Sequence, residues 1–456
     1  MAAANIGQNS EGVDPRAKKA VFGAWLGFYV DLFDIYLPIV VLAPAIGYFI
    51  SPELGTTGIA LVSGSIFAAT LIGRPVGAAI FGHFADTIGR KRTAEISVMG
   101  FGVATLLIGL LPGYQQWGVA AVVLLIVLRF IDGVFLGGEY TAANPLAMEY
   151  SPREKRGYYS GLIDSAFPLA YASISLITLL LLFWLPSEGI GSPYVQWGWR
   201  IPFFIGAALA FGFVVYYRRT VSESELWQHS QKAEAPIRSL FRGENLKSFL
   251  QVFLLMSGLW LSLQTVAAVL PGVLGNAAGL SSTQVTVTLV VAYLVLTPVI
   301  IASGAISQVI GRRPFFIGIG VIMAIVATLL YYLIISQTVS SLFWVVVLTS
   351  VIVSLVVSPF GLTPAYVNER FRVGVRASGY GLAYSLAVVI PSFYAFYQAG
   401  LSTFMPFEYT VLALLVVGGV LIAVGAAWGP ETKDVDFSAD ASATATGPTP
   451  GEEGTG

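Results

Sequence analysis

The residues of this chain that could do chemistry lie inside long apolar runs of the first half. Seven ionisable residues occupy such runs: Asp31, Asp34, Arg74, Arg129, Asp132, Glu139 and Asp164. An ionisable side chain at membrane depth costs about 3 kcal/mol, so its presence indicates a function. Carboxylates there can bind protons or cations, and arginines can bind anions.

The spacing of these residues places them on shared helix faces. Asp31 and Asp34 are three residues apart, as are Arg129 and Asp132, and a helix turns about 100° per residue. Asp132 and Glu139 are seven apart, so their carboxylates would stack on one stripe about 10 Å apart. Because a charged stripe facing lipid is prohibitively costly, we expect it to face an interior cavity.

A carboxylate beside an arginine can alternate between two states. When ionised it pairs with the arginine, and when protonated it releases a guanidinium that can bind a substrate carboxylate. We expect the proton on Asp34 or Glu139, with Asp31 and Asp132 as further coupling acids. We expect an anion to meet Arg129 or Arg74. The alternative is that the arginines and Asp34 form static structural pairs, and we interpret Asp164 as a cap or a local pair.

The second half supplies amides and aromatic rings at depth. Gln264 is a polar residue of its first long apolar run, and Tyr380 and Tyr384 are four residues apart on one helix face. If that face lines a cavity, the two rings could close over an organic acid or cage a quaternary amine. The alternative is that they are packing or interface aromatics.

Composition identifies lipid as the solvent. The chain has 456 residues, of which 56% are hydrophobic and 11% charged, whereas soluble chains are about 25% charged. A net charge of −1 argues against nucleic acid, and the absence of cysteine excludes thiol chemistry. No nucleophile–base pair, phosphate loop or metal-ligand spacing is visible, so we expect no enzyme activity, nucleotide, metal or cofactor.

The apolar runs predict an all-α membrane protein with twelve transmembrane helices in two six-helix bundles, since a spanning helix needs about 20 residues. The spans are expected near 20–48, 57–82, 94–112, 118–148, 158–185, 199–217, 248–274, 284–307, 315–335, 341–367, 377–400 and 407–428. We divide the chain into an N-terminal segment 1–19, bundles 20–217 and 248–428, a central loop 218–247 and a disordered tail 429–456.

The positive charges orient these spans. Of the 24 Lys and Arg residues, 21 fall on the face that carries both termini, and Arg200 is alone on the other face. By the positive-inside rule, both termini lie in the cytoplasm and the protein is a multi-pass protein of the cell membrane.

Two motifs occur once in each half. The stretch "GHFADTIGRKR" aligns with "GAISQVIGRRP" 222 residues later, with Gln308 in place of Asp86. Glu149 and Arg156 are seven apart, as are Glu369 and Arg376. Duplicated six-span units build transporters whose substrate site lies between the halves. The alternative is that Gly and Arg merely suit any cytoplasmic turn.

The first of these motifs resembles the loop signature of the major facilitator superfamily. Further stretches resemble its metabolite:proton symporters, which carry citrate, α-ketoglutarate, shikimate and proline/betaine: "GRPVGAAIFGHFADTIGRKR", "LRFIDGVFLGGEYTAANPLAMEYSPREKRGYYSGL", "GWRIPFFIGAALAFGFVVYYRRTVSESELW" and "ERFRVGVRASGYG". Gln308 departs from the acid usual in relatives, as do Asp31 and Leu32 from the usual Glu and Trp.

The resemblance implies a gate at the cytoplasmic turns. Its members by resemblance are Asp86, Arg90 and Lys91, and we expect Glu149 with Arg156, and Glu369 with Arg376, to extend it. A carboxylate at a helix end can pair with a helix N-terminus or with an arginine of the other half, and this would stabilise an outward-open state. The alternative is a solvated charge cluster.

Three transport functions follow from these observations. The first is proton-coupled uptake of a small organic acid by alternating access, favoured by the arginines, the membrane acids and the family resemblance. The second is proton symport of a zwitterion such as a betaine or amino acid. The third is proton-driven efflux of a drug or metabolite. A membrane enzyme or receptor is the remaining class. The expected partners are the substrate, protons and lipid.

Overall fold

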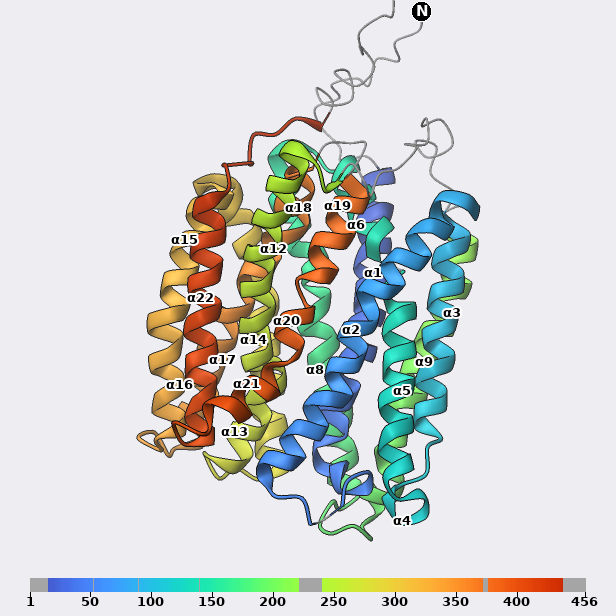
Figure 1. Ribbon diagram of the computed structural model, residues 1–456, viewed down its shortest axis with the longest axis vertical. Helices are drawn as coiled ribbons and strands as arrows, with labels where there is room; N and C mark the ends of the chain where they lie inside the picture. The colour runs from blue at the N-terminus through green and yellow to red at the C-terminus, as the bar shows by residue number, and fades with distance from the viewer. Residues whose placement is uncertain are drawn as a thin grey trace, which may run out of the picture.

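The computed structural model describes residues 15–51, 53–88, 90–138, 140–220, 240–371 and 376–437. Within these residues twelve helices are long and apolar enough to cross a membrane, from Lys18–Val41 to Phe407–Trp428. They run side by side along the long axis of the molecule (Figure 1). The twelve predicted spans are therefore confirmed, with boundaries that differ by a few residues.

Apolar runs fold as helices here because only helices satisfy every backbone group within a single span in lipid. The first-half helices are α1 (Pro15–Val41), α2 (Thr56–Ile88), α3 (Arg90–Gly109), α4 (Tyr114–Trp117), α5 (Val119–Leu136), α6 (Tyr140–Tyr150), α7 (Arg156–Asp164), α8 (Ala166–Trp184) and α9 (Arg200–Thr220), with short turns η1 (Ala43–Tyr48), η2 (Arg153–Lys155) and η3 (Tyr194–Gly198).

The second half repeats this arrangement with more breaks within its spans. Its helices are α12 (Gly243–Gln264), α13 (Leu270–Asn276), α14 (Ser282–Ile310), α15 (Arg312–Ile322), α16 (Thr328–Ile335), α17 (Leu342–Val357), α18 (Thr363–Glu369), α19 (Arg376–Leu386), α20 (Val389–Ser392), α21 (Tyr394–Leu401) and α22 (Thr410–Trp428), with short turns η4 (Thr265–Val269), η5 (Met323–Ala327), η6 (Ser358–Leu362) and η8 (Phe407–Tyr409).

Several predicted spans are not single helices, and among them are the two that carry Asp31 and Asp34, and Arg129 and Asp132. The span expected over 20–48 is helical only to Val41, after which η1 continues the chain as a tighter turn that contains Pro44. The span expected over 118–148 divides into α5 and α6, and residue 139 between them lies outside the described residues. Proline has no backbone N–H to donate, so a helix commonly ends or narrows near it.

Within the first half, α2 and α5 pack closely enough for their backbones to touch. A Cβ atom on Gly133 would overlap the backbone carbonyl of Thr70, and one on Gly77 would overlap that of Val134. Small residues at such positions allow the close approach that drives helix association in membranes. This contact fixes the position of Arg74 relative to Arg129, because the two arginines lie on these two helices.

The two halves meet along two seams. The helix α14 packs against α7 and α8, and α2 packs against α19, α20 and α21. We call the end where α6, α18 and α19 lie the arginine-rich end, and the end where α4 and α13 lie the vestibule end (Figure 1).

Candidate functional site

Two arginines and three aspartates form a buried charge cluster in the first half. Arg74 Nη2 lies 3.1 Å from Asp31 Oδ2. Arg129 Nη1 lies 3.2 Å from Asp34 Oδ2 and 3.0 Å from Asp132 Oδ2. Each of the five side chains is at most 2% exposed. The structure therefore brings together three of the four predicted coupling acids and both predicted anion-binding arginines.

Arg129 is held from several sides. Its guanidinium also donates to the backbone carbonyl of Ile35 at 3.2 Å, and Thr105 donates its hydroxyl to the other oxygen of Asp34. Asp132 Oδ2 is within ion-pair distance of Arg129 but lacks hydrogen-bond geometry. Asp31, in contrast, uses one oxygen for Arg74 and leaves Oδ1 without a hydrogen-bond partner in the described part of the chain. Asp31 and Asp132 thus each leave carboxylate oxygens without hydrogen-bond partners among the described residues, whereas both oxygens of Asp34 accept hydrogen bonds.

Two further acids of the sequence analysis lie elsewhere. Glu139 falls outside the described residues. Asp164 is the last residue of α7 and is 2% exposed, so its side chain does not cap a helix N-terminus. Among the described residues its Oδ2 has no hydrogen-bond partner. Neither the cap nor the local pair that we expected for Asp164 is found among the described residues, since α8 has no side-chain cap and Asp164 forms no ion pair there.

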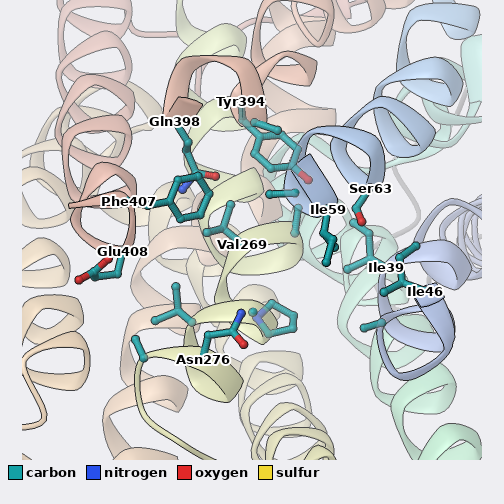
Figure 2. A pocket seen from close by; sticks show the side chains of 18 of the residues that line it. Ile39, Ile46, Ile59, Ser63, Val269, Asn276, Tyr394, Gln398, Phe407 and Glu408 are labelled. Carbon is teal, nitrogen blue, oxygen red and sulfur yellow. The ribbon is translucent and has the colours of Figure 1, made fainter. Parts of the chain in front are cut away.

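A cavity of about 900 Å³ opens between the halves at the vestibule end. Figure 2 labels ten of its lining residues: Ile39, Ile46, Ile59, Ser63, Val269, Asn276, Tyr394, Gln398, Phe407 and Glu408. The first-half helices supply one wall, and η4, α13, α21 and η8 supply the other. The lining is mostly apolar with a few amide and hydroxyl groups, which is typical of sites for small molecules. We call this cavity the vestibule.

Aromatic rings from both halves form a buried cluster that we call the aromatic floor. Its rings are Tyr36, Phe67, Phe167, Tyr171 and Tyr293. Tyr171 and Tyr293 come from opposite halves and stack with centroids 3.9 Å apart. Tyr36 lies between Asp34, in the charge cluster, and Pro38, in the vestibule wall.

The predicted second-half site residues are all buried. Gln264 is fully buried, and neither of its amide atoms has a hydrogen-bond partner among the described residues. Tyr380 and Tyr384 do share a helix face, since their rings stack with centroids 5.6 Å apart. Asn144 of the first half donates to the Tyr380 hydroxyl at 3.1 Å. Neither tyrosine is among the residues lining the vestibule.

The arginine-rich end is closed by ion pairs that cross between the halves. Arg156 Nη1 lies 3.3 Å from Glu369 Oε1, and Arg376 Nη1 lies 3.1 Å from Glu149 Oε1. Each acid of the repeated motif thus pairs with the arginine of the other repeat. Arg312 also binds Glu369 at 3.3 Å, so this carboxylate joins two arginines. All four predicted residues of the Glu–Arg motif meet at one end of the seam.

Gln308, which replaces an acid in the second signature motif, also takes part in this closure. Its Oε1 accepts hydrogen bonds from the Gly157 backbone N–H at 3.1 Å and from Arg312 Nη2 at 2.7 Å. A Cβ atom on Gly157 would overlap the Gly304 carbonyl, so the two halves touch there. The side chains of the other predicted gate residues, Asp86, Arg90 and Lys91, lie outside the described part of the structure.

Sequence reasoning missed Thr105 and most of the aromatic floor. A lone threonine inside an apolar span gives no periodic signal, although its hydroxyl reaches Asp34 from α3. Tyr36 was also missed, but it lies two residues after Asp34 and could have been found as an aromatic beside a membrane acid. Tyr171 gives no signal of its own, because its role depends on the Tyr293 ring of the other half.

Comparison with known proteins places these features in a family. Residues 24–395 match the Major Facilitator Superfamily. An inner membrane metabolite transport protein of Escherichia coli (strain K12) is 28% identical over 84% of this chain and 87% of its own. The shikimate transporter of the same organism is 29% identical over 90% of this chain and 93% of its own.

A solved structure shares the fold. The crystal structure of a D-xylose-proton symporter superposes with a TM-score of 0.68 and 18% identity, covering 91% of this chain and 98% of that protein. Three observations agree with this fold: twelve membrane helices in two bundles, a vestibule between the bundles, and the sequence match. The chain belongs to the Major Facilitator Superfamily and is a secondary transporter of metabolites, not an enzyme.

Proposed function

We propose that this transporter takes up a small organic acid together with a proton. One observation carries the proposal: among the described residues, the buried cluster contains three aspartates and two arginines. If every group were ionised, one negative charge would be left uncompensated in a low-dielectric interior, which is costly. A cluster of this composition favours binding one proton. The aspartate that binds it becomes neutral, so its arginine no longer compensates a negative charge there.

The Arg74–Asp31 pair is the better candidate for meeting the substrate. Asp31 pairs with Arg74 through Oδ2, and its Oδ1 has no hydrogen-bond partner among the described residues, whereas both carboxylate oxygens of Asp34 accept hydrogen bonds. Protonation of Asp31 would remove its charge and leave the Arg74 guanidinium to bind a substrate carboxylate. Proton and anion would then bind together, which is the requirement for symport. Asp34 and Asp132 are the alternative proton sites.

The arginine-rich end faces the cytoplasm in this proposal. The positive charges of the connecting turns concentrate there, as the positive-inside rule requires of a cytoplasmic face. The vestibule would then open to the outside, and the ion pairs Arg156–Glu369 and Arg376–Glu149 would close the inside. Substrate binding beneath the aromatic floor would favour the opposite, inward-open state.

Uptake into proteoliposomes tests this function directly. Purified protein is reconstituted, an acid-outside pH gradient is imposed, and labelled dicarboxylates, hydroxy acids and betaines are supplied in turn. We expect the gradient to drive accumulation of a carboxylate, and we expect a protonophore to abolish that accumulation. Accumulation unaffected by the gradient and the protonophore would refute proton coupling.

Variants then test the assigned residues. Asp31→Asn is expected to abolish gradient-driven accumulation but to keep counterflow exchange of the substrate, and Arg74→Gln is expected to raise KM at least tenfold. Glu188→Gln serves as the control, because it removes the same negative charge from an exposed loop. If Asp31→Asn and Asp34→Asn both accumulate substrate normally, the coupling assignment is wrong. If Arg74→Gln and Arg129→Gln both keep normal affinity, the anion site is elsewhere.

A zwitterionic substrate is the second candidate. The tyrosines of the aromatic floor could surround a quaternary amine by cation–π contact, with an aspartate of the cluster as its counter-ion. Preference for betaines over carboxylates in the same uptake panel would favour it. Efflux is the third candidate, and accumulation only under the reversed gradient would indicate that direction.

A further inference from the structure

The chain continues beyond α22, and residues 431–437 pack across the arginine-rich end (Figure 1, red). We call these residues the tail segment. They belong to the stretch expected to be a disordered tail, but they make defined contacts with both halves. Residues 438–456 lie outside the described part of the chain.

One end of the tail segment is attached to the second half. The Glu431 carboxylate accepts the backbone N–H of Arg312 at 2.9 Å and that of Arg313 at 3.1 Å, at the N-terminus of α15. Thr432 donates its hydroxyl to Glu369 Oε2 at 2.7 Å. These groups all move with the second bundle, so they anchor the segment there.

The other end of the segment reaches the first half. Arg156 Nη1 donates to the Val435 carbonyl at 3.0 Å, and Arg153 pairs with Asp434 at 2.9 Å. The Arg153–Asp434 pair is solvent-exposed and contributes little by itself. The Phe437 ring, in contrast, lies with its centroid 3.8 Å from the guanidinium carbon of Arg156 and 3.8 Å from that of Arg376.

The position of Phe437 between two arginines has a conformational consequence. Arg156 lies on α7 of the first half and Arg376 on α19 of the second. An aromatic ring attracts a cation placed over its face, so one ring between two guanidiniums binds both. It can keep both contacts only while the halves are together at this end. An interaction present in one state alone shifts the equilibrium toward that state.

We propose that the tail segment is a clamp on the closed state of the arginine-rich end. The Phe437 ring must lose its contact with at least one of the two arginines before the halves can separate. The clamp adds to the Glu–Arg pairs and depends neither on which substrate is carried nor on which acid binds the proton.

Distance measurements between paired spin labels test the clamp on the full chain. The protein has no cysteine, so labels can be placed freely. One pair, Tyr158→Cys and Ile310→Cys, reports the arginine-rich end from exposed positions in opposite halves. A second pair, Leu54→Cys and Phe404→Cys, reports the vestibule end in the same way.

Phe437→Leu removes the ring face but keeps an apolar side chain, and truncation after Pro430 removes the whole segment. Both are expected to raise the ratio of separated to closed arginine-rich ends about fivefold, from the loss of two cation–π contacts. The vestibule pair should shorten at the same time, which local unfolding would not produce. Phe437→Trp keeps a ring and truncation after Phe437 keeps the segment, so both should behave like the unmodified protein.

Two results would overturn the proposal. Unchanged distances at both ends in Phe437→Leu and in the truncation after Pro430 would show that the segment does not bias the equilibrium. An equal shift in the truncation after Phe437 would assign the effect to residues 438–456 instead.

Discussion

At the scale of single residues, Arg129 is the centre of the charge cluster. It neutralises carboxylates from two helices, and its second guanidinium nitrogen binds the Ile35 backbone carbonyl, so α1 and α5 are joined through one side chain. Removing one member of a buried ion pair leaves a charge without compensation.

We therefore predict that Arg129→Gln lowers the free energy of unfolding by about 3 kcal/mol and abolishes transport. A thermal-shift assay and proteoliposome uptake measure the two effects. Arg219→Gln, which removes an arginine from an exposed position, is the control and should leave both quantities unchanged. If Arg129→Gln were as stable as the unmodified protein, Asp34 and Asp132 would both have to be neutral in that variant.

Gln264 differs from Arg129, because the structure offers its buried polar group no partner among the described residues. Its buried amide finds no hydrogen-bond partner in the described residues, and an unpartnered buried amide costs about 1–3 kcal/mol. We predict that Gln264→Leu raises the melting temperature while it weakens substrate binding, because a polar group kept at such a cost is typical of a ligand site. If Gln264→Leu transports with unchanged KM, the amide does not contact substrate.

At the scale of helices, the contact between α2 and α5 positions the two arginines. Gly133 faces the Thr70 carbonyl on the neighbouring helix without room for a side chain. We predict that Gly133→Ala lowers the free energy of unfolding by about 1–3 kcal/mol, because backbone atoms cannot move aside cheaply.

The matched control is Gly212→Ala on α9, where a Cβ atom would meet nothing within 4 Å. It should be neutral or slightly stabilising, since alanine favours helix more than glycine does. Both variants are compared by thermal denaturation in detergent. Equal melting temperatures for the two variants would contradict the close packing of α2 and α5.

The attachment of the tail segment to α15 depends on pH through Glu431. Burial tends to raise the pKa of this carboxyl, but hydrogen bonds from the backbone N–H groups of Lys433, Arg312, Arg313 and Thr432 prevail and lower it. A lowered folded-state pKa means that the carboxylate stabilises the fold above its unfolded pKa. The contribution is lost as pH falls through the folded value.

We predict that Glu431→Gln lowers the melting temperature by about 2 °C at pH 7. The difference from the unmodified protein should shrink toward zero as the pH is lowered below 4.5, the ordinary value for this carboxyl. Melting curves across this pH range measure it. A difference that stays constant with pH would show that the charge of Glu431 is not what binds α15.

At the scale of the whole molecule, the halves are joined at one end and separated at the other. The vestibule lies between them at one end, while Glu–Arg pairs, Gln308 and the tail segment close the other. Such an arrangement exposes a central site to one side of the membrane only, as alternating access requires.

The orientation of this molecule in the membrane is testable with an impermeant thiol reagent. We predict that Lys18→Cys and Asp434→Cys are protected in intact cells, because the positive-inside rule places both ends of the chain in the cytoplasm. Glu188→Cys and Phe404→Cys should be labelled from outside. Labelling of only one of the two terminal positions would contradict an even number of spans.

Much of the architecture could be predicted because lipid imposes a simple rule on sequence. Each span is a long and mostly apolar run, and the seven-residue spacing from Glu149 to Arg156 recurs from Glu369 to Arg376. The spacing did not reveal the partners: each acid pairs with the arginine of the opposite repeat. That choice depends on how the bundles face each other, which no local pattern encodes.

The twelve spans, the repeated motifs and the acids and arginines within the spans can all be read from the amino-acid sequence, because long apolar runs and the charges within them are visible along a single chain. The folded structure was needed to show that Arg129 pairs with Asp34 as well as Asp132, that Tyr171 stacks on Tyr293, and that the Phe437 ring contacts both Arg156 and Arg376. These contacts join residues far apart in the chain, and only the packing of whole helices brings them together.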